Sequence, residues 1–596
     1  MNFTTRPLIQ GTFGAVASTH WLASAVGMKL LEAGGNAFDA AAGAGFVLSV
    51  VEPHLNGPLG EVPVLIWPAG EETPSVICGQ GTAPSKATIA HYRGEGLTLV
   101  PGSGLLATVV PGAFGAWILM LRDYGVLPFR KVMEPAIHYA RHGHPLLSAA
   151  STQIALHADF FRREWPSSAR VWTPNGSVPE AGRLFCNPAL ANFWSRLLDE
   201  AETERSRIGQ LEAARLAFYE GPAAEAVDAY ARNACVMDGT GERRRGVISA
   251  DDLAGWQATV EPAISIGYSG WTVWKPGPWT QGPSLLQSLR TADARMLLDI
   301  DHLGDRFVHE VTEILKLSLA DREAFYGDPE HSDIPLRELL STDYGIGRAK
   351  LISESASYEF RPGSVSGLEP QASSFVRRVS ERRDASTGIG GGEPTMIHLE
   401  NRDTDTVHVD VIDRWGNIVS ATPSGGWLQS SPVVPELGVP LNTRAQMFWL
   451  EPGLPSSLAP GRRPRTTLSP SMAVRPDGGR LAFGTPGGDQ QDQWQLIFLL
   501  RLIHHGLNLQ EAIDAPLFHT AHLQSSFYPR AAHPGHLLLE SGFSSGVIKA
   551  LRDRGHDLEY SKPWSIGRLT AAEHGADGIL AAAATPRLMQ AYAIGR

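Results

Sequence analysis

Residues 403–422 read DTDTVHVDVIDRWGNIVSAT and predict a β-hairpin. From His408 to Asp413, residues of different polarity alternate with a period of two, as expected for a strand with two unlike faces. Arg414–Asn417 has the composition of a tight turn, and Ile418–Thr422 is a second strand. Thr406 therefore stands at the start of the first strand.

Thr406 lies behind a polar segment that contains Gly388–Gly392, which we interpret as part of a mobile linker. Cleavage before Thr406 would place a free α-amine beside its own hydroxyl. An α-amine with a pKa of about 8 can accept the hydroxyl proton. This is the threonine–amine form of nucleophilic catalysis. A threonine that opens a strand is more often simply a β-former, so the local pattern leaves both interpretations open.

A second candidate segment is Leu481–Gly488, a strand that enters a glycine turn, with an apolar helix from Trp494 to His505 behind it. Consecutive backbone N–H groups at Gly487 and Gly488 could hold a developing oxyanion. A Gly-Gly turn is usually only a turn. The segment Arg465–Pro470 completes the set of candidates.

The N-terminal region predicts two helices, His20–Ala33 and Ala37–Val51, with Asn36 as the cap of the second. Ala and Gly occupy almost every face of the second helix, which implies burial on all sides. A strand follows at Val62–Trp67, and residues from about 115 to 330 are mostly helical. The mixture predicts sheets covered by helices.

The bulk composition restricts the partners. The 596 residues carry a formal net charge of −11, which favours neither nucleic acid nor an anionic membrane. Cys78, Cys186 and Cys235 are far apart, so neither a disulfide framework nor a zinc knuckle is expected. Because the N-terminus has no apolar signal region and no stretch is long enough to span a bilayer, we expect a cytoplasmic protein.

Motifs for other chemistries are weak or missing. The sequence has no GxSxG elbow and no GxxxxGK phosphate loop, and no cofactor is expected. His142 and His144 form an HxH pair, which we interpret as surface or helix-end histidines. His408 and Asp410 share a strand face and could be metal ligands, but Asp413 falls at the turn. A metal-dependent amidase is therefore kept as a minor alternative.

Seven motifs in this order resemble those of the γ-glutamyltranspeptidase family and cover nearly the whole chain. They are residues 34–41 (GGNAFDAA), 51–54 (VEPH), 83–88 (APSKAT), 110–113 (VPGA), 406–417 (TVHVDVIDRWGN), 468–471 (LSPS) and 484–488 (GTPGG). The resemblance implies an α+β fold, a four-layer αββα N-terminal-nucleophile (Ntn) hydrolase sandwich built from the large and small subunits of one precursor.

The resemblance also implies self-cleavage between Asp405 and Thr406. The products would be a large subunit, residues 1–405, with a mobile linker at about 360–405, and a small catalytic subunit, residues 406–596. They would form a heterodimer, and a higher oligomer is possible. Thr406 would be the nucleophile of both cleavage and turnover, and the remaining roles fall on Ser424 (support of the nucleophile's amine), Gly487 and Gly488 (oxyanion), and Thr466 and Thr467 (substrate carboxylate).

Several pocket positions depart from the family pattern. Ile89 stands where an arginine pairs with the substrate α-carboxylate, and Gln446-Met447 replaces two acids, one of which binds the amino group. Gly426 replaces an asparagine. Both charged contacts to an amino-acid head group are thus lost, which argues against typical γ-glutamyl recognition. Gln446 stays a candidate substrate contact.

Arg444 stands where the family has Gln or Glu, and it suggests a carboxylate or another polar acceptor on the substrate. A structural arginine is an equally good interpretation. Trp427 and Trp449 flank the pocket segments and could line an apolar acyl site.

We therefore predict a self-processing amidohydrolase or acyltransferase of the γ-glutamyltransferase (glutathione hydrolase) family that acts on a small-molecule amide. One alternative is an amidase or acylase of the same superfamily with another acyl group, of the oxamate or cephalosporin-acylase type. A second is an uncleaved, non-catalytic homologue.

Overall fold

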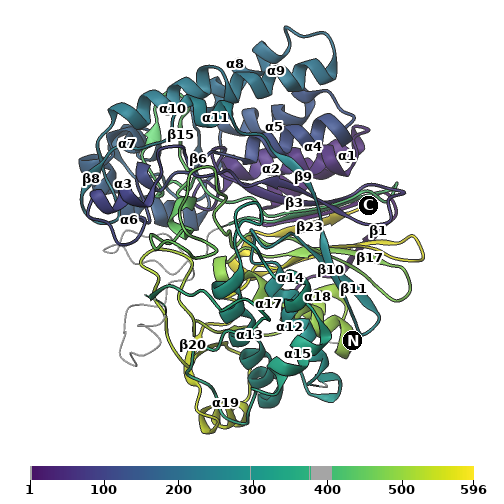
Figure 1. The fold of residues 1–596 in the computed structure, drawn as a ribbon. Helices are drawn as coiled ribbons and strands as arrows, with labels where there is room; N and C mark the ends of the chain where they lie inside the picture. The colour runs from purple at the N-terminus through teal and green to yellow at the C-terminus, as the bar shows by residue number, and fades with distance from the viewer. Residues whose placement is uncertain (1–2, 296, 375, 377–405) are drawn as a thin grey trace.

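The computed structural model describes residues 3–295, 297–374, 376 and 406–596. Two seven-stranded antiparallel sheets lie face to face, and helices cover the outer side of each (Figure 1). The four layers confirm the predicted αββα sandwich. Large buried clusters fill the space between each sheet and its helices, and a third, rich in alanine, fills the space between the sheets.

Strands from both sides of Thr406 are mixed in both sheets. The first sheet runs in the order β1 (Ile9–Gly11), β22 (Leu580–Ala584), β21 (Thr570–His574), β17 (Arg480–Gly484), β16 (Ser471–Val474), β11 (Trp271–Lys275) and β10 (Ile264–Tyr268). The second runs in the order β23 (Tyr592–Gly595), β2 (Gly14–Ser18), β12 (Val409–Asp413), β13 (Ile418–Ala421), β3 (Val62–Trp67), β4 (Ser75–Gly79) and β9 (Thr259–Pro262). Because β12 pairs with β2, and β16 with β11, residues before and after 406 share one core.

The second sheet is covered by helices from the N-terminal region: α1 (Trp21–Glu32), α2 (Ala37–Val51), α4 (Ala113–Tyr124), α5 (Phe129–His142), α8 (Pro188–Ala201) and α9 (Arg207–Tyr219). The first sheet is covered by α12 (Pro283–Asp293), α13 (Asp305–Phe325), α17 (Gln491–His505) and α18 (Leu509–Asp514), as Figure 1 shows.

Shorter elements complete the described chain. The further helices are α3 (Ile89–Gly94), α6 (Ser148–Glu164), α7 (Pro166–Trp172), α10 (Pro222–Asn233), α11 (Ala250–Ala254), α14 (Leu336–Leu339), α15 (Thr342–Ala349) and α19 (Ser545–Asp553). The further strands are β5 (His144–Pro145), β6 (Leu184–Phe185), β7 (Val236–Met237), β8 (Arg243–Arg244), β14 (Val433–Val434), β15 (Val439–Pro440), β18 (Phe518–His519), β19 (His536–Glu540) and β20 (Asp557–Ser561).

The predicted hairpin is present as β12 and β13, and its period of two separates two interiors. Val409 and Val411 belong to the cluster under α1 and α2, whereas Ile412 belongs to the cluster between the sheets. His408 and Asp410 are also fully buried. Both faces of β12 are therefore covered. Its polar side chains have no access to water and form their hydrogen bonds within the protein.

The two N-terminal helices match the sequence prediction to within a residue. Asn36 caps α2 by accepting hydrogen bonds from the N–H groups of Phe38 and Asp39, both at 3.1 Å. Every residue of α2 is buried. A Cβ on Gly45 would lie 2.5 Å from the Trp117 ring, so glycine is required where this helix meets α4.

Asp413 joins the hairpin turn to α2. Its carboxylate accepts from the N–H groups of Ala37, Trp415 and Asn417 at 2.8, 2.9 and 3.0 Å, and from the Asn417 amide at 2.8 Å. A carboxylate at the first turn of a helix is also stabilised by the helix dipole. This residue therefore has a structural role and points away from any metal site shared with His408.

We expect Asp413→Ala to lower the free energy of unfolding by about 2–4 kcal/mol, because a buried acceptor of four hydrogen bonds is removed at once. Urea denaturation checks this. Asp477→Ala is the matched control, since Asp477 accepts a single turn hydrogen bond from Gly479 at 3.0 Å and is largely exposed. Equal midpoints for the two variants would contradict the expectation.

The predicted linker is partly described. Between 360 and 374 the chain packs against α13: the Gly363 N–H donates to Asp321 at 2.6 Å, and Val365 is buried beside Phe325. Most of the rest of the predicted linker, with the Gly388–Gly392 run and Asp405, lies outside the described residues.

Candidate active site

Thr406 is fully buried just before β12. Its φ is +96°, a conformation that a β-branched residue adopts only under constraint. Its N–H donates to the Leu55 carbonyl at 3.1 Å, and its Oγ1 lies 3.1 Å from Ser424 Oγ. The predicted nucleophile is thus held rigidly against the predicted supporting hydroxyl, although its predicted cleavage partner Asp405 is outside the described residues.

Ser424 is fixed by its backbone as well as by its side chain. It forms a two-way bridge with Glu61, in which the Glu61 N–H donates to Ser424 O at 2.9 Å and the Ser424 N–H donates to Glu61 O at 3.0 Å. Arg444 Nη2 donates to Ser424 Oγ at 2.9 Å. The three predicted residues Thr406, Ser424 and Arg444 therefore form one chain of contacts.

Arg444 is paired with Glu61, a partner that the sequence analysis missed. Arg444 Nε donates to Glu61 Oε1 at 2.5 Å, and Nη2 reaches the same oxygen. Both side chains have no exposed surface. Burial raises the pKa of the Glu61 carboxyl, and the Arg444 charge opposes that rise. The arginine predicted to meet a substrate carboxylate already has a carboxylate of the protein.

Aromatic side chains enclose Arg444. Its guanidinium carbon lies 5.2 Å from the Trp427 ring centroid and 5.9 Å from that of Phe527. Trp427, Met447 and Phe527 form one buried apolar cluster. Trp427 is therefore part of a buried apolar cluster with Phe527, and its place in an acyl site stays a prediction.

The Gly487-Gly488 turn lies where β17 ends and α17 begins. The φ values of the two glycines are +128° and +52°. A Cβ on Gly487 would lie 2.3 Å from the Trp494 ring, so the turn depends on glycine. Gln281 donates to Gly488 O at 3.1 Å, which fixes the orientation of that peptide.

Thr466 and Thr467 occupy the segment between Arg465 and β16. Thr466 Oγ1 accepts a hydrogen bond from the Leu468 N–H at 3.3 Å. Thr467 Oγ1 is buried and has no hydrogen-bond partner among the described atoms. A free buried hydroxyl is costly to leave unpaired, so Thr467 is the better candidate for a ligand contact of the two.

Gln446 and the Gly487-Gly488 turn are joined by the segment Ser525–Arg530, which the sequence analysis missed. Gln446 Oε1 accepts from the Tyr528 N–H at 3.0 Å, and Arg530 donates to the Gln446 carbonyl at 2.9 Å. Ser526 donates to Asp489, next to Gly488, at 2.6 Å. No motif marks this segment, and its bridging role follows from tertiary contacts that a single sequence does not encode locally.

A second group of buried titratable residues, together with Arg568, lies near Thr406. Arg568 donates to the Thr406 carbonyl at 3.4 Å. Burial raises the pKa of Glu52 to about 8, and Arg568 opposes the rise. Burial lowers the pKa of His54 to about 3, with Arg568 acting in the same direction. These groups too were not foreseen as part of the site.

His408 and Asp410 form a closed hydrogen-bond network instead of an open ligand set. His408 Nε2 and Nδ1 lie 2.9 Å from Asp410 Oδ1 and 2.8 Å from Thr422 Oγ1. Asp410 also accepts from Ser420 and Thr570, both at 2.8 Å. Every nitrogen of His408 and both oxygens of Asp410 are thus engaged.

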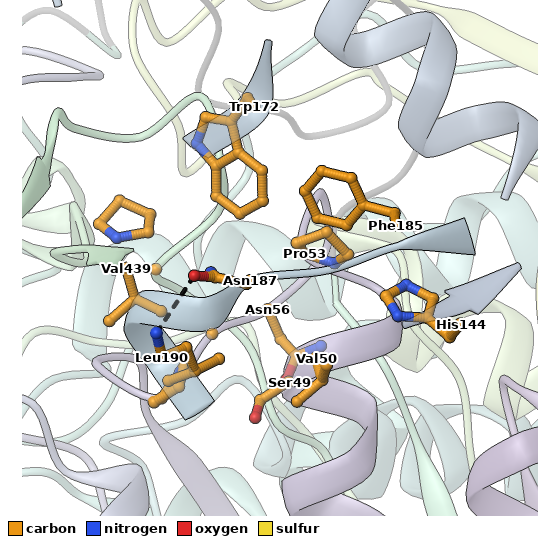
Figure 2. A pocket seen from close by; sticks show the side chains of 14 residues that line it. Ser49, Val50, Pro53, Asn56, His144, Trp172, Phe185, Asn187, Leu190 and Val439 are labelled. Carbon is orange, nitrogen blue, oxygen red and sulfur yellow. Dashed lines mark hydrogen bonds between the residues drawn. The ribbon is translucent and has the colours of Figure 1, made fainter. Parts of the chain in front are cut away.

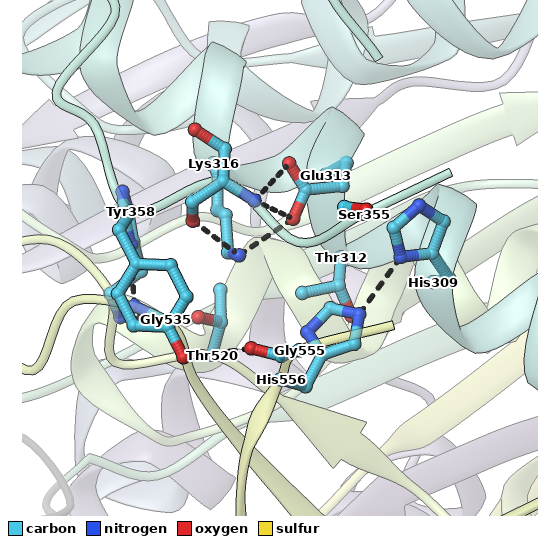
Figure 3. A network of polar contacts seen from close by, with 12 residues as sticks. His309, Thr312, Glu313, Lys316, Ser355, Tyr358, Thr520, Gly535, Gly555 and His556 are labelled. Atoms are coloured by element: carbon cyan, nitrogen blue, oxygen red, sulfur yellow. Dashed lines mark hydrogen bonds and ion pairs between the residues drawn. The ribbon is translucent and has the colours of Figure 1, made fainter. Parts of the chain in front are cut away.

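The described residues contain one cluster with the composition of a metal site, His309, Glu313 and His556, and it is remote in sequence from His408 (Figure 3). His309 Nδ1 lies 2.9 Å from His556 Nε2, and the Glu313 carboxylate already accepts from Lys316 at 2.6 Å and Arg361 at 3.1 Å. Because two cationic side chains already neutralise Glu313, this cluster is unfavourable for binding a metal cation.

The two histidines of the predicted HxH pair differ in exposure, because His142 is exposed and His144 is buried.

A small cavity lies behind the Ser424 segment (Figure 2). It is lined by Ser49 and Val50 of α2, by Asn56, and by Gly426 two residues beyond Ser424, with Trp172 and Phe185 on the opposite side.

Among the described residues, no helix combines the length and the hydropathy that crossing a bilayer would require.

The fold defines the class of the molecule: two face-to-face sheets covered by helices on both outer sides are those of the Ntn hydrolases. The sequence model of the γ-glutamyltranspeptidase family matches residues 23–594, and the chain belongs to that family. The predicted fold class and family are confirmed.

Similar proteins differ in their named activities. The chain is 28% identical over 97% of both chains to a glutathione hydrolase-like YwrD proenzyme of Bacillus subtilis. It is 31% identical to an acylase ACY 1 proenzyme of Pseudomonas sp., over 96% of this chain and 92% of that one. The solved structure of LmbA2991HD matches with a TM-score of 0.93 and 51% identity over the full length of both chains. The chain is accordingly an enzyme, and its family alone does not fix the substrate.

Proposed function

We propose that this chain is a self-processing amidohydrolase that uses Thr406 as its nucleophile. The observation that carries the proposal is the contact of 3.1 Å between Thr406 Oγ1 and Ser424 Oγ in a fully buried, conformationally constrained position. Cleavage would separate residues 1–405 from residues 406–596. The named relatives described above are proenzymes, which supports a processing step.

In the processing step, Thr406 Oγ attacks the carbonyl carbon of Asp405, and its proton passes through Ser424 Oγ or water to the departing α-nitrogen. The C–N bond breaks as the new ester forms, so the α-amine of Thr406 becomes free. Water then hydrolyses the ester and releases the carboxyl group of residue 405. The hydroxyl is regenerated beside an amine that can act as its base.

In turnover, the α-amine takes the hydroxyl proton while Oγ attacks the substrate amide carbon. The Gly487 and Gly488 N–H groups are proposed to receive the negative charge on the carbonyl oxygen. The amine product leaves with the proton, and water, or an acceptor amine, then releases the acyl group from Thr406. Thr466 and Thr467 are proposed to contact the acyl group, with the unpaired hydroxyl of Thr467 as the stronger candidate.

We further propose that the acyl group is not γ-glutamyl. Arg444 is already paired with Glu61, so a carboxylate of the protein takes the place that a substrate carboxylate would need. Trp427, Met447 and Phe527 form a buried apolar cluster, which we propose lies next to the acyl group. The relative named an acylase supports an activity other than glutathione hydrolysis, and the glutathione hydrolase-like relative keeps γ-glutamyl amides as the alternative.

The test is a denaturing gel of the purified wild type followed by intact-mass analysis after incubation with γ-glutamyl amides and with amides of apolar acids. We expect two fragments of about 44 and 21 kDa, from division of the 64.3 kDa chain in proportion to residue number. The smaller fragment should carry the acyl group of a substrate. A single uncut chain that takes up no acyl group would overturn the proposal.

Ser424 is expected to support both steps. In Ser424→Ala, loss of the hydroxyl contact should slow processing and turnover by roughly 10- to 100-fold. Ser424→Thr keeps a hydroxyl and should stay within a few-fold of the wild type. Processing half-times from gel time courses check both variants, and an unimpaired Ser424→Ala protein would remove Ser424 from the machinery.

A further inference from the structure

Glu61 and Arg444 form a fully buried ion pair whose remaining polar contact leads to the candidate nucleophile. Arg444 donates through Nε and Nη2 to Glu61 and through Nη2 to Ser424, at 2.9 Å for the latter. Its Nη1 approaches Met447 Sδ at 3.9 Å, a weak contact. Apart from Glu61, Ser424 Oγ is therefore the stronger of the two side-chain acceptors that the Arg444 guanidinium contacts.

The local backbone is built around this pair. Glu61 and Ser424 exchange backbone hydrogen bonds just before β3, so the Glu61 carboxylate is held beside the Ser424 hydroxyl. Gly425 has a φ of +78°, and a Cβ there would lie 2.5 Å from Glu61 Oε1. The glycine after Ser424 thus leaves the space that the carboxylate occupies.

A buried ion pair adds little to stability, because the cost of removing two charges from water offsets their attraction. The presence of this ion pair next to Ser424 therefore suggests an electrostatic effect on the site. With Arg444 donating into Ser424 Oγ, the proton of Ser424 is free to point at Thr406 Oγ1, and the arginine lies one hydroxyl away from the nucleophile.

We propose that Glu61 and Arg444 are positioning residues that orient Ser424 toward Thr406 and hold a partly neutralised cation beside the α-amine that cleavage creates. This inference rests on the proposed role of Thr406. The cation disfavours the ammonium form of the amine and so keeps it available as a base at neutral pH, while Glu61 limits the size of that effect.

Other buried titratable or charged groups lie near Thr406 and the elements next to it. Arg568 contacts the Thr406 carbonyl from the loop before β21, Glu52 and His54 come from the segment after α2, and His408 lies on β12. All of them are retained in the Glu61 and Arg444 variants and in the wild type. Differences between variants can therefore be assigned to the pair itself.

The two halves of the pair should shift the pH dependence in opposite directions. In Glu61→Gln the cation is no longer neutralised, so the acid limb of activity should move to lower pH by roughly 0.5–1 unit. In Arg444→Met the cation is absent, and the limb should move to higher pH by a similar amount. A structural role alone would give equal losses without opposite shifts.

The measurement is the rate at which p-nitrophenyl acetate acetylates the small fragment across pH, followed by p-nitrophenolate release and by intact mass. Glu540→Gln is the matched control, since Glu540 and Arg587 form another buried ion pair, with exposures of 2% and 1%. It should lower the unfolding temperature without moving the acid limb. If the Arg444→Met or Glu61→Gln variant does not fold, Arg444→Lys and Glu61→Asp are measured instead. Both keep the charges and should retain the acid limb of the wild type.

The outcomes separate this inference from the proposed function. Opposite shifts at Glu61 and Arg444 support it, as does a folded variant that stays uncut while Glu540→Gln is processed normally. Unchanged acid limbs in both variants overturn it and leave Thr406 as the nucleophile. Acetylation of a Thr406→Ala chain at the wild-type rate would instead overturn the proposed function.

Discussion

Thr406→Ala is expected to stay a single chain of 64.3 kDa and to lose amide hydrolysis by on the order of 10⁴- to 10⁶-fold. Both losses have the same physical origin, because the hydroxyl 3.1 Å from Ser424 is proposed to attack first the chain and then the substrate. The position of this hydroxyl is fixed because Thr406 directly precedes β12, which is paired on both edges. Gel analysis and initial rates check the two losses together.

Thr406→Ser is the control for this prediction, because it keeps the hydroxyl and the α-amine and removes the methyl group. It should be processed and active, with slower rates where the methyl group helps to fix the rotamer. A Thr406→Ala protein that still divides into two fragments would show that another residue cuts the chain. Normal hydrolysis by that variant would remove the threonine from turnover as well.

Gly487→Ala is expected to reduce kcat by on the order of 10²- to 10³-fold, which is the usual cost of losing one oxyanion donor. Its φ of +128° strains any residue with a Cβ, and that Cβ would lie 2.3 Å from the Trp494 ring. The peptide must rotate to relieve the contact, which turns the proposed N–H donors away. Steady-state kinetics should show the loss in kcat rather than in KM, since the donors act on the transition state.

Gly478→Ala separates strain from oxyanion loss. Gly478 has a φ of +93° in the turn between β16 and β17, and a Cβ there would meet no atom within 4 Å. This variant should show a modest stability loss with kcat unchanged. Equal kinetics for the two glycine variants would place the oxyanion donors elsewhere.

Much of the scaffold could be predicted from the sequence because the local signals agree with the tertiary structure. The capping side chain of Asn36 and the small residues of Ala37–Val51 predicted a buried helix with the observed ends. The alternation from His408 to Asp413 predicted a strand, and it is an interior strand of a sheet. Short-range periodicity carries such information, since each face of an element sees a single environment.

The site was predicted less completely, because its contacts join residues far apart in the chain. Glu61 and Arg444 are separated by 383 positions, and no local pattern marks either as the partner of the other. Arg444 was assigned to a substrate carboxylate or to a structural role, and the structure pairs it with the protein. The segment Ser525–Arg530 likewise has no motif of its own, and its importance follows from bridging Asp489 and Gln446.

The mixed strand order of the two sheets has a mechanical consequence for a chain cut at Thr406. Pulling the two pieces apart would break the hydrogen-bond ladders between β2 and β12 and between β11 and β16, and would expose the alanine-rich space between the sheets to water. The two fragments of the cut chain should therefore stay together on dilution, whereas two separately folded domains in contact would dissociate. Its halves should melt in one cooperative transition, and neither half has a complete interior with which to refold alone.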